Sequence, residues 1–526
     1  MDGQGDGTGF SAREPDRRTE EAVFLGSVPP EPLTPPAMAV NMSEVLPSGE
    51  LIGDSARPRS KLAELFNLRP GEWTLVLAFG GLLTISTLIS ELADVVATSG
   101  FVSRIGPKEV PWLWIGDMLV TLALAGAYAS IVDRSSRVKL ITWLTGGMVA
   151  MYLVIQFLFS FNAPDWLTYP LLYIVSDQQY ALFPLAFWAL ANDMYTGAET
   201  KRLFPLIGAG YTLGALLGNA TAGLAALLFA RTGLSPVSLV AACTIFSLIA
   251  YCILQVVFFG RPVPARQSRR AAEGLRAIFG AGLDYFRSVP VFHYLGLIIL
   301  SVHLARTLLQ FHFLSVVNRI SVGTLQFQAV YSLYNVALII MTVGFQLLAA
   351  SRLLNRIQLK GAFWVLPITL MFAVVTTFVL PGWPGSAMGF FLVLLIEDAW
   401  DVPARKSLQN LVPDERRGSV STFFDTYFYA IATIGACLLL LLLIAVAAAC
   451  GVTDQVMTYL YLTVGAAAAV LAVWSALQLQ SAYNKSLYNW RLIRSRRNSS
   501  AAGSRNLLEN IEKKRSSAHD SVIPPH

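Results

Sequence analysis

Polar and ionisable side chains recur at helical spacing inside stretches that are otherwise apolar. The first series consists of Thr87, Ser90, Glu91, Asp94 and Thr98. Residues three or four apart lie on one face of a helix, so these side chains are expected to form a single polar stripe. Carboxyl groups in such a stripe are suited to binding a polar solute. Because burial disfavours their charged form, they are also suited to carrying a proton.

A second series contains a cation. It consists of His303, Arg306, Thr307 and Gln310. A charged group inside a bilayer is expensive and therefore faces a cavity or a partner. Arg306 is the one Lys or Arg that we place well inside an apolar block, so we predict that it meets an acid or an anionic part of a solute. A purely structural ion pair is the alternative.

Further acids lie in two other apolar blocks. Asp177 lies in one block, and Glu397, Asp398 and Asp401 lie in another, where Arg405 follows Asp401 at helical spacing. We interpret Asp401 and Arg405 as a structural pair. The candidate residues for binding a solute or an ion are Glu91, Asp94, Asp177, His303, Arg306, Gln310, Glu397 and Asp398.

Four other ionisable residues have simpler interpretations. His293 and His312 lie near the ends of an apolar block, and we predict that both are interfacial. Asp425 is predicted to pair with Arg416 or Arg417 near a helix end. Asp117 stands alone in its block and is not among the candidates.

The blocks themselves define the fold class. Hydrophobic residues make up 55% of the 526 and charged residues only 14%, whereas a soluble chain carries about 25% charged residues. A membrane-spanning helix needs about 20 mostly apolar residues, and the blocks lack the alternation of barrel strands. We therefore predict an all-α polytopic membrane protein. Its twelve spans are 73–98, 111–132, 139–161, 167–191, 203–230, 236–259, 291–316, 325–350, 361–380, 386–403, 421–449 and 455–480.

The distribution of Lys and Arg predicts the orientation of these spans. Basic residues crowd into alternate connections, and the other connections hold only Arg104, Lys108, Arg231 and Arg319. Positive charge marks the cytoplasmic side, so we expect both termini in the cytoplasm and a location in the bacterial inner membrane. The predicted regions are a disordered segment 1–60, a six-helix half 61–259, a basic cytoplasmic loop 260–290, a second six-helix half 291–480 and a basic tail 481–526.

The two halves share a loop motif. Asp133, Arg134 and Arg137 follow the second span, and Asn355 and Arg356 follow the eighth. The acid or amide of such a motif can cap a neighbouring helix and pair with Arg, which would latch two helices at the cytoplasmic gate. An ordinary basic loop is the alternative. The motif resembles the loop motif of the major facilitator superfamily, which implies a solute site between the halves at mid-membrane.

Other stretches resemble the nucleotide (ATP/ADP) translocase branch of that superfamily. They are Asp94 with 99–101, 105–106 and 111–114, then 201–210, then 412–418. The resemblance implies the fold and, as one alternative activity, nucleotide exchange. The nucleotide exchangers carry a Lys just before the acid that corresponds to Asp94, but this chain has Ala93. A further Lys of that family is replaced near Leu113 and Trp114. Phosphates need cationic partners, so these departures weigh against a polyanion.

Several classes of chemistry are absent from the sequence. It has no Gly-rich phosphate loop, no Cys/His metal spacing and no catalytic triad, so we expect neither an enzyme nor a cofactor or metal. The four cysteines are interpreted as inert core residues. Gly208, Gly210, Gly214 and Gly218 are interpreted as a close-packing helix face. The basic loops are explained by membrane topology, so nucleic acid is not an expected partner.

The preferred function is secondary active transport of a small polar solute by alternating access, with a proton or another ion as the candidate for coupling. A nucleotide exchanger and a non-transporting membrane receptor or scaffold are the alternatives. The expected partners are the solute and the lipid bilayer, with anionic lipid at the basic tail. The identity of the solute and the oligomeric state do not follow from the sequence.

Overall fold

The computed structural model describes residues 72–131, 135–233, 235–258, 275–350, 356–357, 361–380, 382–409, 412 and 414–483. The predicted disordered segment, nearly all of the basic tail, and Asp133, Arg134 and Asn355 of the loop motif lie outside these residues. The first half contains α2 (Trp73–Arg104), η1 (Pro107–Glu109), α3 (Val110–Ile131), α4 (Arg137–Ser160), α5 (Asp165–Met194), α6 (Gly197–Thr232) and α7 (Ser238–Phe258).

The second half follows a shorter helix, α8 (Leu275–Ser288), within the predicted central loop. It contains α9 (Pro290–Ile320), α10 (Thr324–Phe345), α12 (Val365–Val379), α13 (Trp383–Ile396), α14 (Val402–Gln409), α15 (Asp414–Thr422), α16 (Tyr429–Ala449) and a last helix, Asp454–Tyr483. Five- or six-residue π-helical segments continue α10, α13 and α15, namely η2 (Gln346–Ala350), η3 (Glu397–Asp401) and η4 (Phe423–Phe428).

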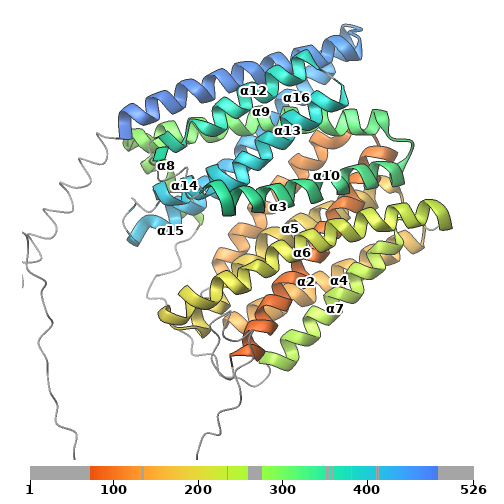
Figure 1. Cartoon of the computed structure of the whole chain (residues 1–526), viewed down its shortest axis with the longest axis vertical. Coiled ribbons are helices and arrows are strands. Elements are labelled where there is room, and N and C mark those ends of the chain that lie inside the picture. The colour runs from red at the N-terminus through yellow and green to blue at the C-terminus, as the bar shows by residue number, and fades with distance from the viewer. Residues whose placement is uncertain are drawn as a thin grey trace, which may run out of the picture. The chain divides into compact units, whose positions relative to one another are not determined.

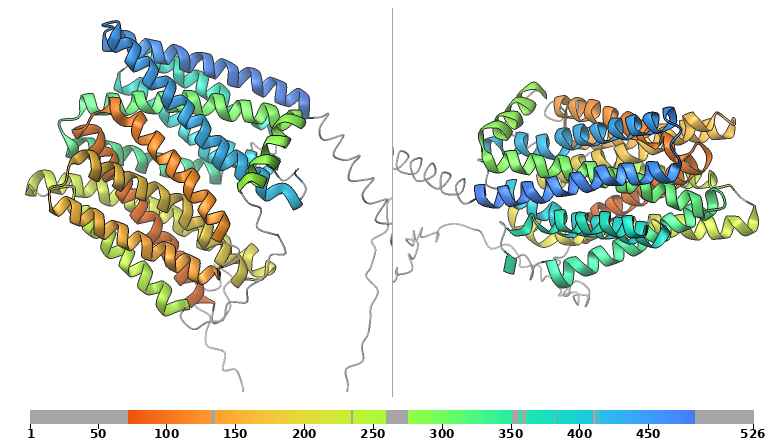
Figure 2. Two further views of the ribbon diagram at one scale, coloured as in Figure 1. Left: turned by 180° about the vertical axis from the view of Figure 1, so that it is seen from behind. Right: turned by 90° about the horizontal axis from the view of Figure 1, so that it is seen from above.

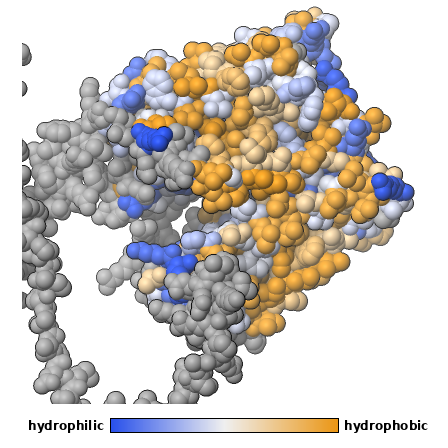
Figure 3. All heavy atoms as spheres, in the orientation of Figure 1, coloured by the Kyte–Doolittle hydropathy of each residue, from blue (hydrophilic) through white to orange (hydrophobic). Residues whose placement is uncertain are grey.

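These helices match the twelve predicted spans. Within the described ranges, nine helices are long and apolar enough to cross a bilayer. Three further runs complete the set. They are α5, which is long but rich in polar side chains, the 15-residue α12, and α13 with η3 and α14. Large apolar side chains such as Leu77, Trp143, Leu228 and Leu442 are more than half exposed. Figure 3 shows such hydrophobic surface over both halves, which is the surface that lipid covers.

The two halves lie side by side as two bundles (Figures 1 and 2). Helices α2 and α6 of the first half pack on α10, and α3 packs on α16. We call the side that carries α8, α14 and α15 the central-loop face, and the other side, where α9 is joined to α10, the opposite face.

The helix pair α2 and α6 approaches closely along the glycine face predicted from the sequence. A Cβ atom on Gly210 would lie 2.5 Å from the carbonyl oxygen of Gly80, and one on Gly218 would lie 2.7 Å from that of Leu88. Between them, a Cβ atom on Gly214 would overlap the carbonyl oxygen of Thr84. Gly208 is not part of this face, because its Cβ atom would lie 3.9 Å from the Trp188 ring. Backbone thus packs directly on backbone.

We expect Gly214→Ala to destabilise the protein strongly. The added methyl group must push two backbones apart, and such overpacking costs about 1–3 kcal/mol. The melting temperature and folded yield in detergent should both fall. The matched control, Gly208→Ala, adds the same atom in ordinary contact distance and should leave both unchanged. Equal effects of the two changes would contradict the close packing of α2 on α6.

Two details of the fold differ from the sequence-based expectation. The segment 260–290 was expected as a loop, but α8 occupies its second part and packs on α9, α15 and η4. Gly282 permits this packing, because a Cβ atom there would overlap the ring of Phe423. Of the cysteines, Cys243 and Cys437 are buried as predicted, whereas Cys252 and Cys450 are exposed. Apolar sequence alone does not distinguish a lipid-facing position from a core position.

Candidate functional site

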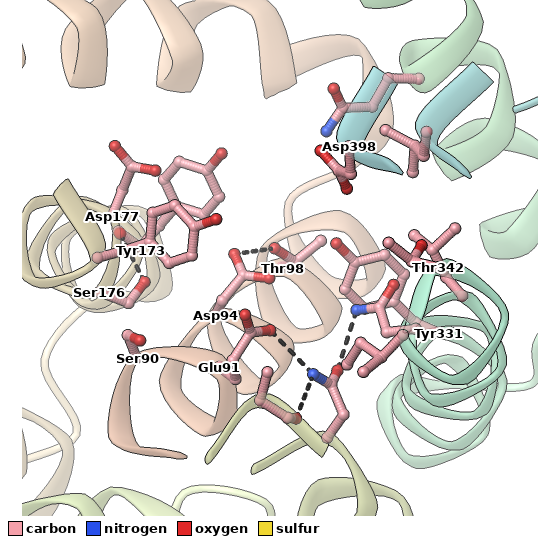
Figure 4. A pocket seen from close by; sticks show the side chains of 18 of the residues that line it. Ser90, Glu91, Asp94, Thr98, Tyr173, Ser176, Asp177, Tyr331, Thr342 and Asp398 are labelled. Atoms are coloured by element: carbon pink, nitrogen blue, oxygen red, sulfur yellow. Dashed lines mark hydrogen bonds between the residues drawn. The ribbon is translucent and has the colours of Figure 1, made fainter. Parts of the chain in front are cut away.

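A cavity of about 690 Å³ lies between the two halves. Its lining comes from α2, α3, α5, α6, α9, α10, η2, α13, η3, α14 and α16. It reaches Val110 and Trp114 near the opposite face, and Gln346 and Val402 toward the central-loop face. Figure 4 shows its acids and tyrosines pointing from several helices into one space. The polar series on the first span and part of that on the seventh therefore meet in one chamber.

The first half supplies three carboxyl groups to the cavity, those of Glu91, Asp94 and Asp177 (Figure 4). Glu91 accepts a hydrogen bond from Asn219 Nδ2 at 2.9 Å. Asp94 accepts one from Thr98 Oγ1 at 3.3 Å, one helical turn further along α2. Ser90 and Thr98 also line the cavity, whereas Thr87 faces Gly214 of α6. Four of the five residues in the predicted stripe therefore face the cavity.

The second half supplies the cation. Arg306 lines the cavity, and its Nε lies 2.9 Å from Glu397 Oε2, which confirms the predicted pairing with an acid. Gln310, one turn along α9, and Asp398 also line the cavity. Glu397 is 7% exposed and lies behind Arg306 rather than in the lining. Arg306 is the one Lys or Arg among the lining residues, and its charge is therefore balanced by Glu397, which lies outside the cavity.

The cavity consequently has an excess of acids. Four carboxyl groups line it, two contributed by α2, one by α5 and one by η3. Tyrosine hydroxyl groups lie among them, from Tyr173, Tyr180, Tyr211, Tyr331 and Tyr429. Such a chamber offers hydrogen bonds to a polar solute and attracts positive charge, and it offers little to a polyanion.

Sequence reasoning missed two polar clusters, one beside the cavity and one in its lining. Asp117 is 1% exposed and accepts a hydrogen bond from Gln178 Nε2 at 3.1 Å. Its location inside an apolar block was the available signal, but no partner could be assigned to it. On the other side, Asn335 Nδ2 of α10 donates to Asn219 Oδ1 of α6 at 3.0 Å, which links Glu91 to the second half. Neutral amides in apolar blocks gave no comparable signal.

Two predicted residues are placed differently by the structure, and a third histidine lies near them. His303 is 3% exposed, does not line the cavity, and lies edge-on to the Tyr429 ring. His312 was predicted to be interfacial but is 3% exposed, with Nδ1 2.6 Å from the Tyr461 hydroxyl oxygen. This prediction was wrong because α9 continues to Ile320, two turns beyond His312. His293 is half-buried at the start of the same helix.

Two of the predicted ion pairs can be compared with the structure. Asp401 and Arg405 form the expected pair, at 2.7 Å. Asp425 pairs with Lys406 at 2.5 Å and also accepts from Gln409 and Ser421. The side chain of Arg416, one of its two predicted partners, lies outside the part of the chain that the structure describes. The π-helical segment η4 carries Asp425 toward α14, which helix spacing alone did not predict.

The predicted gate motif is only partly described. Arg137 lies at the start of α4, and its Nε is 3.6 Å from Asp193 Oδ2 at the end of α5. This contact joins two helices of the first half at the central-loop face, which is the kind of latch the motif predicts. Arg356 of the second half is exposed.

Contacts between the halves gather toward the opposite face. Ser103 Oγ at the end of α2 lies 2.7 Å from Thr324 Oγ1 at the start of α10. Lys108 pairs with Asp454 across the same face at 3.0 Å. Deeper in the bundle, Gln328 Nε2 donates to the carbonyl oxygen of Ala222 at 2.8 Å. These contacts join the two halves on that side.

Comparison with known proteins identifies the fold. No protein-family model matches the chain, and no curated sequence matches it. Among solved structures, a bacterial homologue of the human lysosomal transporter Spinster, inward-facing and unoccupied, is similar with a TM-score of 0.56 at 15% identity, over 80% of this chain and 98% of that chain. A point mutant of the nucleoside transporter NupG is similar with a TM-score of 0.55 at 14% identity, over 78% of this chain and 99% of that chain.

A bacterial homologue of the iron transporter ferroportin, also inward-facing, gives a TM-score of 0.50 at 17% identity, over 78% of this chain and 100% of that chain. These structures are transporters of the major facilitator type, and the two whose names include a solute differ in it, nucleoside for one and iron for the other. At such low identity the likeness establishes the fold, namely twelve membrane helices in two six-helix halves. It does not establish the narrower resemblance to nucleotide translocases.

Proposed function

We propose that this protein is a secondary transporter that moves a small polar solute across the membrane by alternating access. The observation that carries the proposal is the acid-rich chamber between the halves, together with the contacts that join the halves at the opposite face. In a transporter with two such halves, the solute site lies between them and is exposed to one side at a time.

The residues divide into two sets of roles. Glu91 and Asp94 of the first half, with Gln310 and Asp398 of the second, are positioned to contact the solute. Arg306 and Glu397 join α9 to η3, so they hold together the wall of the second half. Because each half supplies polar groups, a bound solute would bridge them and favour their closing around it.

The central-loop face is proposed to be cytoplasmic, since it carries the basic connections. The chamber would then be in its inward-facing state, as in two of the similar structures. A neutral or cationic solute is favoured over a nucleotide, because the single lining Arg already has a carboxylate partner.

Uptake by reconstituted vesicles tests this function. We expect time-dependent uptake of at least one member of a panel of amines, amino acids, sugars and nucleosides. We expect Asp94→Asn to reduce it at least tenfold with an unchanged melting temperature. Selective uptake of nucleotides would instead support the exchanger suggested by the sequence resemblance. A folded protein that takes up no solute from any class would contradict the transporter and favour a receptor or scaffold.

A further inference from the structure

A pair of carboxyl groups lies at the wall of the cavity that the first half supplies. Asp117 of α3 is buried, and its carboxyl group is in hydrogen-bond contact with that of Asp177 of α5. Asp177 lines the cavity and Asp117 does not. The pair is therefore enclosed on the side of Asp117 and reaches the chamber through Asp177, which Figure 4 shows among the lining residues.

The surroundings of the pair are oxygen-rich and leave one acceptor open. Gln178 Nε2 donates to Asp117 Oδ1 and also to Thr121 Oγ1 at 2.7 Å. The Thr121 hydroxyl itself donates to the main-chain oxygen of Asp117 at 3.0 Å, so it has no proton left for Gln178. Gln178 is 3% exposed, and its Oε1 has no hydrogen-bond partner among the described residues.

The groups that face the pair bring no compensating cation. Asp94 of α2 and Tyr173 of α5 face Asp117, and Tyr429 of α16 faces Asp177. Arg306, the cation of the cavity lining, is already in contact with Glu397. Two adjacent carboxylates cannot both stay ionised in such surroundings unless a positive charge lies between them.

We propose that Asp117 and Asp177 together hold one monovalent cation, either a proton or Na⁺, which enters and leaves through the chamber. A shared proton satisfies the carboxyl pair directly. The alternative, Na⁺, is a hard cation that prefers oxygen ligands, which both carboxyl groups and Gln178 Oε1 can supply. The cation site itself does not depend on the proposed transport function. Only the role of the bound cation in driving solute movement rests on that function. The site places the coupling charge beside the solute-contacting acids Glu91 and Asp94.

Infrared spectroscopy of the purified full-length protein tests the site without any solute. If a proton is held, the carbonyl band of a protonated carboxyl group should be present at neutral pH and lost in Asp117→Asn and in Asp177→Asn. The control Asp454→Asn alters an exposed acid that pairs with Lys108, and it should keep the band. If Asp117→Asn does not fold, Asp177→Asn still tests the site.

A comparison of NaCl with choline chloride at equal ionic strength separates the two cations. If Na⁺ is held, NaCl should raise the melting temperature of the unmodified protein but not that of Asp117→Asn, because a ligand stabilises the state it binds. If a proton is held, the two salts should act alike. A protein with neither an Asp117-dependent carboxyl band nor an Na⁺-specific shift would overturn the proposal.

Uptake measurements then distinguish failure of the site from failure of the transport function. A band or an Na⁺ shift in a protein without uptake would leave the cation site standing and remove the proposed function. Uptake by a protein that has neither the carboxyl band nor the Na⁺ shift would support the proposed transport function and remove the cation site. If both hold, uptake by the unmodified protein should respond to an imposed pH or Na⁺ gradient, and uptake by Asp117→Asn should no longer respond.

Discussion

Oxidation of a Ser103→Cys/Thr324→Cys variant is expected to reduce solute uptake to the level of empty vesicles, and a reductant should restore it. The two native oxygen atoms lie 2.7 Å apart on different halves, so sulfur atoms at these positions are placed to form a disulfide. The bond would hold the opposite face closed. Uptake requires that this face opens once in every transport cycle, so the effect should be nearly complete.

The cross-linking experiment has a matched control on the same face of the membrane. The single variant Ser103→Cys carries only one new thiol and cannot tie the halves together, so oxidation should leave its uptake unchanged. The native cysteines, two of which are exposed, are first replaced by alanine or serine. Equal loss of uptake in both oxidised variants, or full activity of the Ser103–Thr324 cross-link, would contradict opening at this face.

The second large effect is expected at the ion pair of the second half. Arg306→Gln leaves Glu397 buried without its cation, and Glu397→Gln leaves Arg306 without its acid. Breaking one side of a buried pair costs about 3–5 kcal/mol, so each single variant should melt at a lower temperature and lose uptake. The double variant Arg306→Gln/Glu397→Gln should recover the melting temperature. It should not recover uptake, because Arg306 also lines the chamber.

A second pair in the same region provides the control. Asp401 and Arg405 lie on η3 and α14, and neither lines the chamber. The double variant Asp401→Asn/Arg405→Gln should therefore keep its uptake. Recovery of both melting temperature and uptake by the Arg306/Glu397 double variant would make that pair purely structural. A normal melting temperature for Arg306→Gln alone would show that the ion pair contributes little to stability.

Much of this architecture follows from hydrophobic periodicity and charge. Twelve apolar blocks predicted the spans, since each block needs only enough length to cross a bilayer. The stripe around Glu91 and Asp94 was predicted to face the interior because helical spacing fixes which side chains share a face. The glycine face of α6 could be predicted for the same reason, although Gly208 was wrongly included in it.

Pairings between helices were harder to predict, because they depend on how each helix is rotated against its neighbour. Arg306 was predicted to meet an acid, but five of the candidate residues are acids, and spacing along the chain could not select Glu397 among them. Asp117 was left out because its partners lie on α5, which is a neighbour of α3 in space but is 60 or more residues away in the sequence. The partner of Asp425 was missed because η4 changes the direction of its side chain.

The π-helical segment η3 gives the run from α13 to α14 room for a change in residue number. A π turn accommodates one more residue than an α turn, so η3 behaves like an α-helix that has gained a residue. Loss of one residue between 397 and 401 would let this turn become an α turn, and α13 and α14 would keep their rotation relative to each other. Loss of one residue within α13 or α14 themselves would instead rotate the following part of the helix by about 100°. A one-residue deletion is therefore expected to be better tolerated within η3 than in the helices on either side of it.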